Sequence, residues 1–355
     1  MKKKIAITKG DGIGPEVVDE GIKILKIISN YTDIDLEFQD APAGGNVWKE
    51  KGASLPEKSL EIIKNSDALL FGAIGLPNLP QGVAESAILR LRQELDLYVN
   101  LRPIKLYNPL KEQSPLKEEF IGNGIDFTII RENTEGLYAN IGGFLKDEVA
   151  VNNMVYTKNG CERIIRYAYE FAKTHKHTKI TSVDKANILK PSQMWRNIFK
   201  QIGNEYPNIE QENYYIDAFC QWIIRKPFAF QIVVTGNLFG DIISDEAAFL
   251  VGSLGMASSG NIHPGKVSMY EPIHGSAPDI AGKKIANPIG TILSVKLMME
   301  ESFKMPEIGL NIEKAVELSL IEGRTTDIKD NILKTLSTQQ MGDLIAEKLK
   351  NQLKS

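Results

Sequence analysis

Two aspartates at helical spacing could together bind a divalent metal ion. Asp241 and Asp245 follow the apolar run 232–234, and a helix that starts near Gly240 would stack their carboxylates on one face. Like charges at this spacing repel each other, and a cation would turn that repulsion into binding. Ligand sets that contain only oxygen favour Mg²⁺ or Mn²⁺ over zinc. The alternative is a purely local role, because carboxylates also stabilise the N-terminus of a helix.

A metal site of this kind needs a third carboxylate, and Asp217 is the candidate. A zinc site is not indicated, because the four histidines are scattered along the chain. Cys161 and Cys220 have no partner at metal-ligand spacing. We interpret them as reduced or buried thiols of a cytoplasmic protein.

Several arginines could bind a small substrate that carries two or three carboxylates. The guanidinium group is a rigid fork of donors that grips a carboxylate with two hydrogen bonds. Arg102 precedes a proline, and Arg131 directly follows the apolar run 127–130. Arg90 and Arg92 lie close together at 88–92. Each of these arginines, taken singly, is also compatible with a solvated surface position.

The glycine-rich turn at 10–14 is a weak match to a phosphate-binding loop. The dinucleotide fingerprint requires a glycine where Pro15 stands. We therefore interpret Gly10, Gly12 and Gly14 as residues that allow a tight turn and close helix packing. The nucleotide site is expected elsewhere in the chain.

The elements that must position these residues alternate between strands and helices. Such alternation indicates an α/β architecture in which helices cover the faces of the sheets. The 355 residues exceed what one hydrophobic core usually holds, so two domains are expected. Residues 140–156 break the rhythm and predict a β-hairpin arm that could reach another subunit. The predicted strands are 4–8, 35–38, 68–71, 125–130, 179–183 and 231–235, and the predicted helices include 16–28 and 57–65.

The overall composition excludes several classes of function. A formal net charge of -3 gives no electrostatic reason to expect nucleic acid or a membrane surface as a partner. The longest apolar run, 68–76, contains two glycines and is too short to span a bilayer. The basic residues at 2–4 lack a following apolar stretch, so they do not predict a signal peptide.

Taken together, these motifs resemble the isocitrate/isopropylmalate dehydrogenase family of β-decarboxylating dehydrogenases. The resemblance runs nearly end to end, and its most specific stretches are 237–255 and 271–288. It implies a two-domain α/β fold that differs from the standard Rossmann fold. Residues 1–100 with 256–355 would form the larger, cofactor-binding domain. Residues 101–255 would form the smaller, dimer-forming domain, with the arm at about 138–158.

The resemblance also implies a reaction, the NAD-dependent oxidation and decarboxylation of a 2-hydroxy acid with a β-carboxylate. Lys185 would assist removal of the hydroxyl proton, and Tyr138 would protonate the enolate carbon as a general acid. A bound Mg²⁺ or Mn²⁺ would stabilise the enolate as a Lewis acid. Lys185 and Asp217 would be donated across the interface of a homodimer with shared active sites. The implied metal ligands are Asp217, Asp241 and Asp245, and the implied carboxylate-binding residues are Arg92, Arg102 and Arg131.

In this family the adenosine of the cofactor would lie along 274–287. Asp279 followed by Ile280 is similar to the NAD-using version, because a carboxylate accepts from the ribose 2′-hydroxyl and repels a 2′-phosphate. NADP-using members tend to carry a lysine–tyrosine pair there. The implied cofactor-binding residues are Glu271, His274, Gly275, Ser276, Ala277, Asp279, Ile280 and Asn287.

Substrate choice in this family would depend on the stretch 85–89. Ile88 and Leu89 can pack an isopropyl group and offer nothing to a third carboxylate, so 3-isopropylmalate is the expected substrate. Ser86 fits the isocitrate pattern and Ile88 does not. The form of 131–136 is similar to isocitrate, tartrate and D-malate enzymes, so these substrates and homoisocitrate stay as alternatives.

Two other classes of protein are less well supported. A non-catalytic regulatory subunit would be expected to lose some reactive residues, whereas Tyr138, Lys185 and the three aspartates are all present. A phosphoryl-transfer enzyme would need a phosphate-binding loop with a lysine, and no G-x-x-x-x-G-K-[ST] motif occurs.

Overall fold

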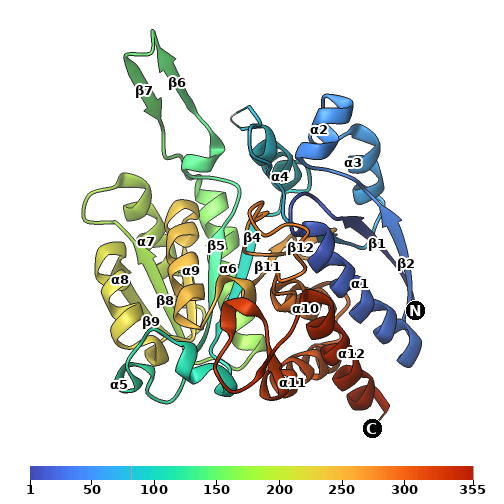
Figure 1. Cartoon of the computed structure of the whole chain (residues 1–355). Helices are drawn as coiled ribbons and strands as arrows, with labels where there is room; N and C mark the ends of the chain where they lie inside the picture. Colours follow the sequence, from blue (N-terminus) through green and yellow to red (C-terminus); the bar gives the residue numbers. More distant parts are fainter. Residues whose placement is uncertain (81, 355) are drawn as a thin grey trace. The chain divides into compact units, whose positions relative to one another are not determined.

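The computed structural model describes residues 1–80 and 82–354 and has an α/β architecture. The chain divides into two compact units (Figure 1). Unit 1 comprises 1–97, 107–113 and 252–355, and unit 2 comprises 98–106 and 114–251. The cofactor-binding and dimer-forming roles expected of the two domains stay predictions. No described helix is both long and apolar enough to cross a membrane.

Unit 1 contains five strands that form a mixed sheet. Their order is β2 (Asp35–Asp40), β1 (Lys2–Thr8), β3 (Ala68–Phe71), β12 (Ser268–Pro272) and β11 (Ser258–Ile262). The first four are parallel, and β11 runs antiparallel to β12. All four residues of β3 are buried, as expected of an apolar run in a sheet that is covered on both faces.

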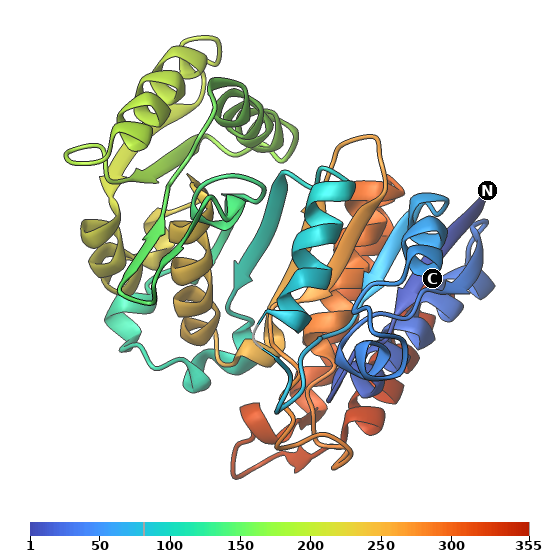
Figure 2. The same cartoon turned by 90° about the horizontal axis from the view of Figure 1, so that it is seen from above.

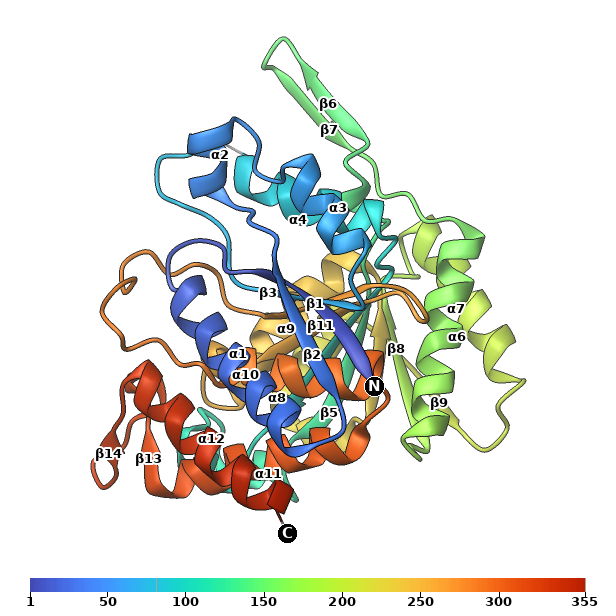
Figure 3. The same cartoon turned by 90° about the vertical axis from the view of Figure 1, so that its right-hand side faces the viewer.

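Helices pack on the strands of unit 1. Helix α1 (Gly14–Tyr31) contacts α12 (Thr338–Lys354) and α10 (Ile289–Leu297), and α10 contacts β11 and β12 (Figure 3). Helix α3 (Glu57–Lys64) packs on β1 and β2. Its residues Leu60 and Ile63 form one buried apolar cluster with Ala87 and Leu91 of α4 (Val83–Glu94). The remaining elements of this unit are α2 (Gly45–Lys51), α11 (Pro306–Glu322), the π-helical turn Met298–Ser302, β13 (Gly323–Arg324), β14 (Lys334–Thr335) and the short 3-10 turns Asn108–Gln113, Leu254–Met256 and Thr326–Ile328.

Unit 2 contains five strands of its own. Their order is β4 (Val99–Lys105), β5 (Asp126–Glu132), β10 (Ile232–Thr235), β8 (Lys179–Asp184) and β9 (Glu210–Tyr215), and only β4 and β5 are antiparallel. One pair of helices, α6 (Lys158–Thr174) and α7 (Lys190–Gly203), lies on one side of these strands (Figure 2). Helix α9 (Asn237–Leu250) lies on the other side, beside α8 (Ile216–Arg225). The short elements are α5 (Glu118–Ile121) and the turns Leu137–Ala139 and Pro227–Ala229.

A two-stranded arm extends from unit 2 (Figure 1). It consists of β6 (Gly142–Leu145) and β7 (Val149–Asn152), which pair antiparallel, so the predicted hairpin is confirmed. Its side chains are exposed although several are apolar, with Phe144 80% exposed. A backbone bridge between Gly136 and Val155 closes the base of the arm.

Candidate functional site

Helix α9 carries the two aspartates that the sequence singled out. It begins at Asn237 and not near Gly240, so Asp241 lies a full turn inside the helix. The alternative role at the helix N-terminus is therefore wrong for Asp241, because the unpaired backbone donors belong to the first turn. Arg102 on β4 lies 3.6 Å from Asp241 Oδ1 and 3.2 Å from Asp245 Oδ1. One guanidinium thus bridges both carboxylates, which confirms that they share a face.

Arg131 lies within β5, one residue before the strand ends, and its side chain is only 1% exposed. It donates from Nη1 to Asp241. The Tyr138 hydroxyl donates to the other oxygen of that carboxylate at 2.6 Å. The guanidinium also lies 5.3 Å from the centre of the Tyr138 ring, within the range of a cation–π interaction. The structure therefore brings three predicted site residues, Arg131, Tyr138 and Asp241, into one cluster.

Burial is the main influence on the pKa of Asp245, and charges of both signs lie near it. Loss of hydration against neighbouring atoms raises the pKa of Asp245 and the charge of Asp241 adds to this, although Arg102 and Arg131 oppose it. More than half of the side chain, 58%, stays exposed. Two carboxylate groups that face the same space offer only oxygen ligands, which is the donor chemistry that suits Mg²⁺ or Mn²⁺. The residues present fit such an ion.

Lys185 and Asp217 form a separate ion pair in unit 2. Lys185 directly follows β8, and Asp217 lies in the first turn of α8. The hydrogen bond from Lys185 lowers the pKa of Asp217. The preceding Asp184 is buried and accepts two hydrogen bonds from Arg196, at 2.9 and 2.8 Å, and one from the Ala186 amide. Sequence reasoning missed Asp184 and Arg196, which hold the turn that carries Lys185.

The three predicted metal ligands do not meet within one chain. Across residues 1–80 and 82–354, no group of three or more His, Cys, Asp or Glu side chains is placed to hold a metal ion. Asp217 lies with Lys185, whereas Asp241 and Asp245 lie with Arg102. The predicted three-carboxylate site, with Asp217 donated from a second chain, stays a prediction.

In unit 1, Arg92 lies beside Glu271. Arg92 is buried in α4, and its Nη2 is 3.9 Å from Glu271 Oε1 on β12. The same Glu271 oxygen accepts a 2.8 Å hydrogen bond from Asn261 on β11. A residue predicted to bind substrate and a residue predicted to bind cofactor are thus neighbours.

The predicted specificity residues of α4 point in different directions. Ser86 donates to the Val83 carbonyl at 2.7 Å and lies 2.9 Å from the Ser54 hydroxyl, beside a cavity of about 260 Å³. Ile88 packs against the buried cluster of unit 1. Leu89 is half-buried. Arg90 pairs at the surface with Glu57.

The glycine turn packs tightly, as predicted. Gly10 and Gly12 have φ values of +76° and +56°, which favour glycine. The Ile13 amide donates to the Ser276 carbonyl at 2.8 Å, and a Cβ on Gly12 would collide with that carbonyl. Sequence reasoning missed Asp11, a fully buried carboxylate in the same turn. It accepts from the amides of Gly45, Asn46 and Gly75 at 2.6, 2.9 and 3.0 Å.

The segment predicted to bind the cofactor is a loop between β12 and α10. His274 Nδ1 lies 3.0 Å from the Gly275 carbonyl, and its buried Nε2 has no hydrogen-bond partner among residues 1–80 and 82–354. Because a carbonyl only accepts, Nδ1 carries the proton and Nε2 is an acceptor in the neutral ring. Burial lowers the pKa of His274, which favours that neutral form. Gly275 and Asp279 are exposed.

Other members of this loop serve to hold it in place. Asn287 donates to Asp327 at 3.0 Å and accepts from the Ile289 amide at 3.0 Å, so its amide is used within the protein. Asp327 also accepts from the Ser253 hydroxyl at 2.6 Å. Ala277 and Ile280 pack on Ile13 and Val17 of the glycine turn and α1. The Gly282 amide donates to Glu16 at 2.6 Å.

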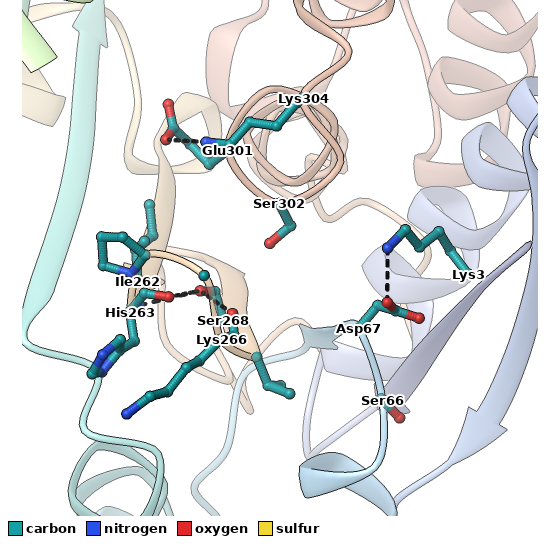
Figure 4. Close-up of a pocket in the computed structure, with 13 residues that line it drawn as sticks. Lys3, Ser66, Asp67, Ile262, His263, Lys266, Ser268, Glu301, Ser302 and Lys304 are labelled. Atoms are coloured by element: carbon teal, nitrogen blue, oxygen red, sulfur yellow. Dashed lines mark hydrogen bonds and ion pairs between the residues drawn. The ribbon is translucent and has the colours of Figure 1, made fainter. Parts of the chain in front are cut away.

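A larger cavity of about 470 Å³ lies elsewhere in unit 1 and contains no predicted site residue (Figure 4). Several of its polar groups pair with other protein groups. Lys3 pairs with Asp67 at 2.9 Å, and the Ser302 hydroxyl is 2.7 Å from the Tyr270 hydroxyl. We assign it no function.

Comparison with known proteins covers nearly the whole chain. Residues 4–345 match the isocitrate/isopropylmalate dehydrogenase family. Proteins named 3-isopropylmalate dehydrogenase from Aquifex aeolicus and Thermotoga maritima are 45% and 44% identical, over 98% of this chain and 98% and 99% of their own. The crystal structure of isocitrate dehydrogenase from Methylococcus capsulatus has a TM-score of 0.88 at 35% identity, covering 98% of this chain and 99% of its own. That of a β-decarboxylating dehydrogenase from Thermococcus kodakarensis has a TM-score of 0.82 at 36% identity, covering 99% and 97%. The chain therefore belongs to the isocitrate/isopropylmalate dehydrogenase family and has its two-domain α/β fold.

Proposed function

We propose that this protein is a 3-isopropylmalate dehydrogenase, which depends on NAD and on Mg²⁺ or Mn²⁺. The observation that carries the proposal is the cluster of Arg102, Arg131, Tyr138, Asp241 and Asp245, which places two arginines and a phenol around two carboxylates. Curated relatives at 41–45% identity over nearly their whole length are named 3-isopropylmalate dehydrogenase. Those names favour this substrate over isocitrate, homoisocitrate, tartrate and D-malate.

Asp241 and Asp245, with Asp217 of a second chain, would hold the metal ion. A bound divalent cation supplies Lewis acidity, which polarises the substrate hydroxyl and stabilises the charge left after loss of CO₂. The raised pKa of Asp245 and the like charge beside it support this assignment.

Arg92, Arg102 and Arg131 are assigned to the two carboxylates of the substrate. Arg102 is oriented by Ser244, to which it donates from Nη1, and it already contacts two carboxylates. Arg131 is covered by Tyr138 and Asp241, so its pairing with substrate requires the Tyr138 side chain to move. Leu89 is the better candidate to contact the isopropyl group, because Ile88 already packs on the core.

Two side chains would move the protons. Lys185 is proposed to take the hydroxyl proton during oxidation as the neutral amine, which becomes the ammonium ion; its side chain is oriented by a hydrogen bond to Asp217. Tyr138 is proposed to protonate the carbon from which CO₂ departs. The phenol proton of Tyr138 now points at Asp241, which keeps the hydroxyl at the carboxylate cluster.

NAD is the proposed cofactor, bound along the loop 274–287 with Glu271. The exposed Asp279 carboxylate can accept from a ribose 2′-hydroxyl and would repel a 2′-phosphate. His274 offers its Nε2 as an acceptor. Ser276, Ala277, Ile280 and Asn287 shape the loop, since their side chains or backbones contact the protein itself.

A cytoplasmic homodimer with shared active sites is the proposed assembly. The apolar side chains of the arm are exposed, and so is Phe249 on α9, at 63%. Exposed apolar side chains that gather on one element are typical of surfaces that bind another chain. The two free cysteines suit a reducing compartment.

An NADH-formation assay would test the proposal. The purified protein is given NAD and Mg²⁺ or Mn²⁺ with 3-isopropylmalate, isocitrate, homoisocitrate, D-malate or tartrate in turn. We expect the highest kcat/KM with 3-isopropylmalate and none without metal. A higher kcat/KM for any of the other acids, or equal turnover in a chelator, would contradict it.

A further inference from the structure

The Asn237 side chain is a fully buried amide at the start of α9, for which the reaction proposed above has no use. It lies between Arg131 and the base of the arm. Its Oδ1 accepts from Arg131 Nε at 3.0 Å and from Nη2 at 2.7 Å, and its Nδ2 donates to the Glu135 carbonyl at 3.0 Å. An arginine only donates and a carbonyl only accepts, so the amide has one orientation that satisfies both.

These contacts decide which side of the Arg131 guanidinium faces the other site residues. A guanidinium has two edges that can each grip an oxygen acceptor. Asn237 occupies the edge formed by Nε and Nη2. The Nη1 group is left to meet Asp241, the carboxylate that also accepts from Tyr138.

We propose that Asn237 is a positioning residue for Arg131, an inference that rests on the proposed function. It holds the guanidinium so that only the Nη1 side is presented to the substrate carboxylate. Without it, the Nε and Nη2 donors would be buried without an acceptor, and the guanidinium would turn to satisfy them. Arg131 would then have to reorient each time substrate binds, which weakens binding.

The helix start offers a matched control for a merely structural effect. The Asn237 backbone amide donates to the hydroxyl of the half-buried Tyr156 at 2.8 Å. Tyr156→Phe removes the acceptor of the first backbone amide of α9. It leaves the Asn237 side chain and its hydrogen bonds to Arg131 in place. Any loss that comes only from loosening the helix start should therefore appear in Tyr156→Phe as well.

The first experiment measures steady-state kinetics of Asn237→Ala, Tyr156→Phe and the unchanged enzyme. Asn237→Ala should raise the KM for 3-isopropylmalate about tenfold, as expected when a hydrogen bond to a charged group is lost. The KM for NAD should stay within about twofold, because the predicted cofactor residues belong to unit 1. Tyr156→Phe should leave both values within about twofold. An equal rise in substrate KM for both variants would overturn the inference.

The second experiment asks whether Asn237 acts through Arg131. Arg131→Lys removes the edge that Asn237 holds, so adding Asn237→Ala to it should change the substrate KM by less than about twofold. If the two changes multiply, Asn237 acts by another route and the inference is wrong. This coupling is a property that a purely structural residue would not show.

A second Asn237 variant and the unchanged enzyme provide two further tests. If Asn237→Ala does not fold, Asn237→Leu keeps roughly the size of the side chain but offers Arg131 no acceptor; its substrate KM should also rise about tenfold, and an unchanged KM would refute the role. The unchanged enzyme separates the two proposals. Its failure to oxidise 3-isopropylmalate would reject the proposed function, whereas a normal enzyme with an unaffected Asn237 variant rejects only this inference.

Discussion

The carboxylate cluster of unit 2 and the predicted cofactor loop of unit 1 differ in the backbone structure that carries their residues. In unit 2, the reactive side chains lie on β4, β5 and α9, and they bond to one another. In unit 1, the loop 274–287 has little regular structure. The carboxylates of Glu16 and Asp327 hold it by accepting from the Gly282 amide and from the Asn287 side chain. Charged side chains that must meet at one point need rigid strands and helices to place them. A loop that lies along a ligand needs only a few hydrogen bonds that fix its position.

The largest effect is expected when the charge in the carboxylate cluster is changed. Asp241→Asn should lower kcat/KM in the presence of Mg²⁺ on the order of a hundredfold or more, because it weakens the proposed ion site and the acceptor of Arg131 and Tyr138. Asp126→Asn is the control, because Asp126 is an exposed carboxylate at the start of β5 that pairs with Lys105 at the surface. Near-normal turnover of Asp241→Asn at limiting Mg²⁺ would remove the metal assignment.

A smaller but selective effect is expected at the cofactor loop. Asp279→Lys should shift the ratio of kcat/KM for NADP and NAD about tenfold or more toward NADP, because it replaces a repulsive charge with an attractive one. Asp279→Asn, which removes the charge without reversing it, should give an intermediate ratio. An unchanged ratio in both variants would end the argument for NAD from this residue.

The buried Asp11 carboxylate of the glycine turn should contribute to the stability of the fold. Asp11→Asn leaves one oxygen to accept from three backbone amides, so we expect a loss of about 1–3 kcal/mol in the free energy of unfolding. Chemical denaturation monitors this loss. Asp19→Asn on α1, a half-exposed partner of Lys9, should cost less than about 0.5 kcal/mol. Equal costs for the two variants would show that the buried amides do not depend on Asp11.

The smallest effect concerns pH. Burial holds the pKa of His274 below its ordinary value of 6.5, so below that pH the unfolded chain takes up a proton that the folded His274 does not. The free energy of unfolding should therefore fall as the pH drops below about 6.5, and this contribution is fully present above it. His274→Gln should show a shallower fall in denaturation experiments. The same slope in both proteins would contradict this role of burial.

Local patterns in the sequence were enough for several of the strands, for the hairpin arm and for one feature of the site. Strands such as β3 and β10 are short apolar runs bounded by polar residues, and the hairpin arm shows alternating valines and a glycine pair. The four-residue spacing of Asp241 and Asp245 places them on one helical face in any α-helix. The helix begins at Asn237, three residues before the predicted start, and the distant Tyr156 hydroxyl that accepts from its first amide is a contact that the local sequence does not reveal.

Contacts between segments far apart in the chain could be learned only from the folded protein. Arg102 meets Asp245 across 143 positions, and Asp11 binds amides 34 to 64 positions away. Spacing along a chain says nothing about such partners, because they depend on strand order and on the path of loops. Residue type and periodicity therefore establish which groups are available and on which face of an element they lie. The packing of strands and helices against one another decides which of those groups become neighbours, since a side chain reaches only a few ångströms.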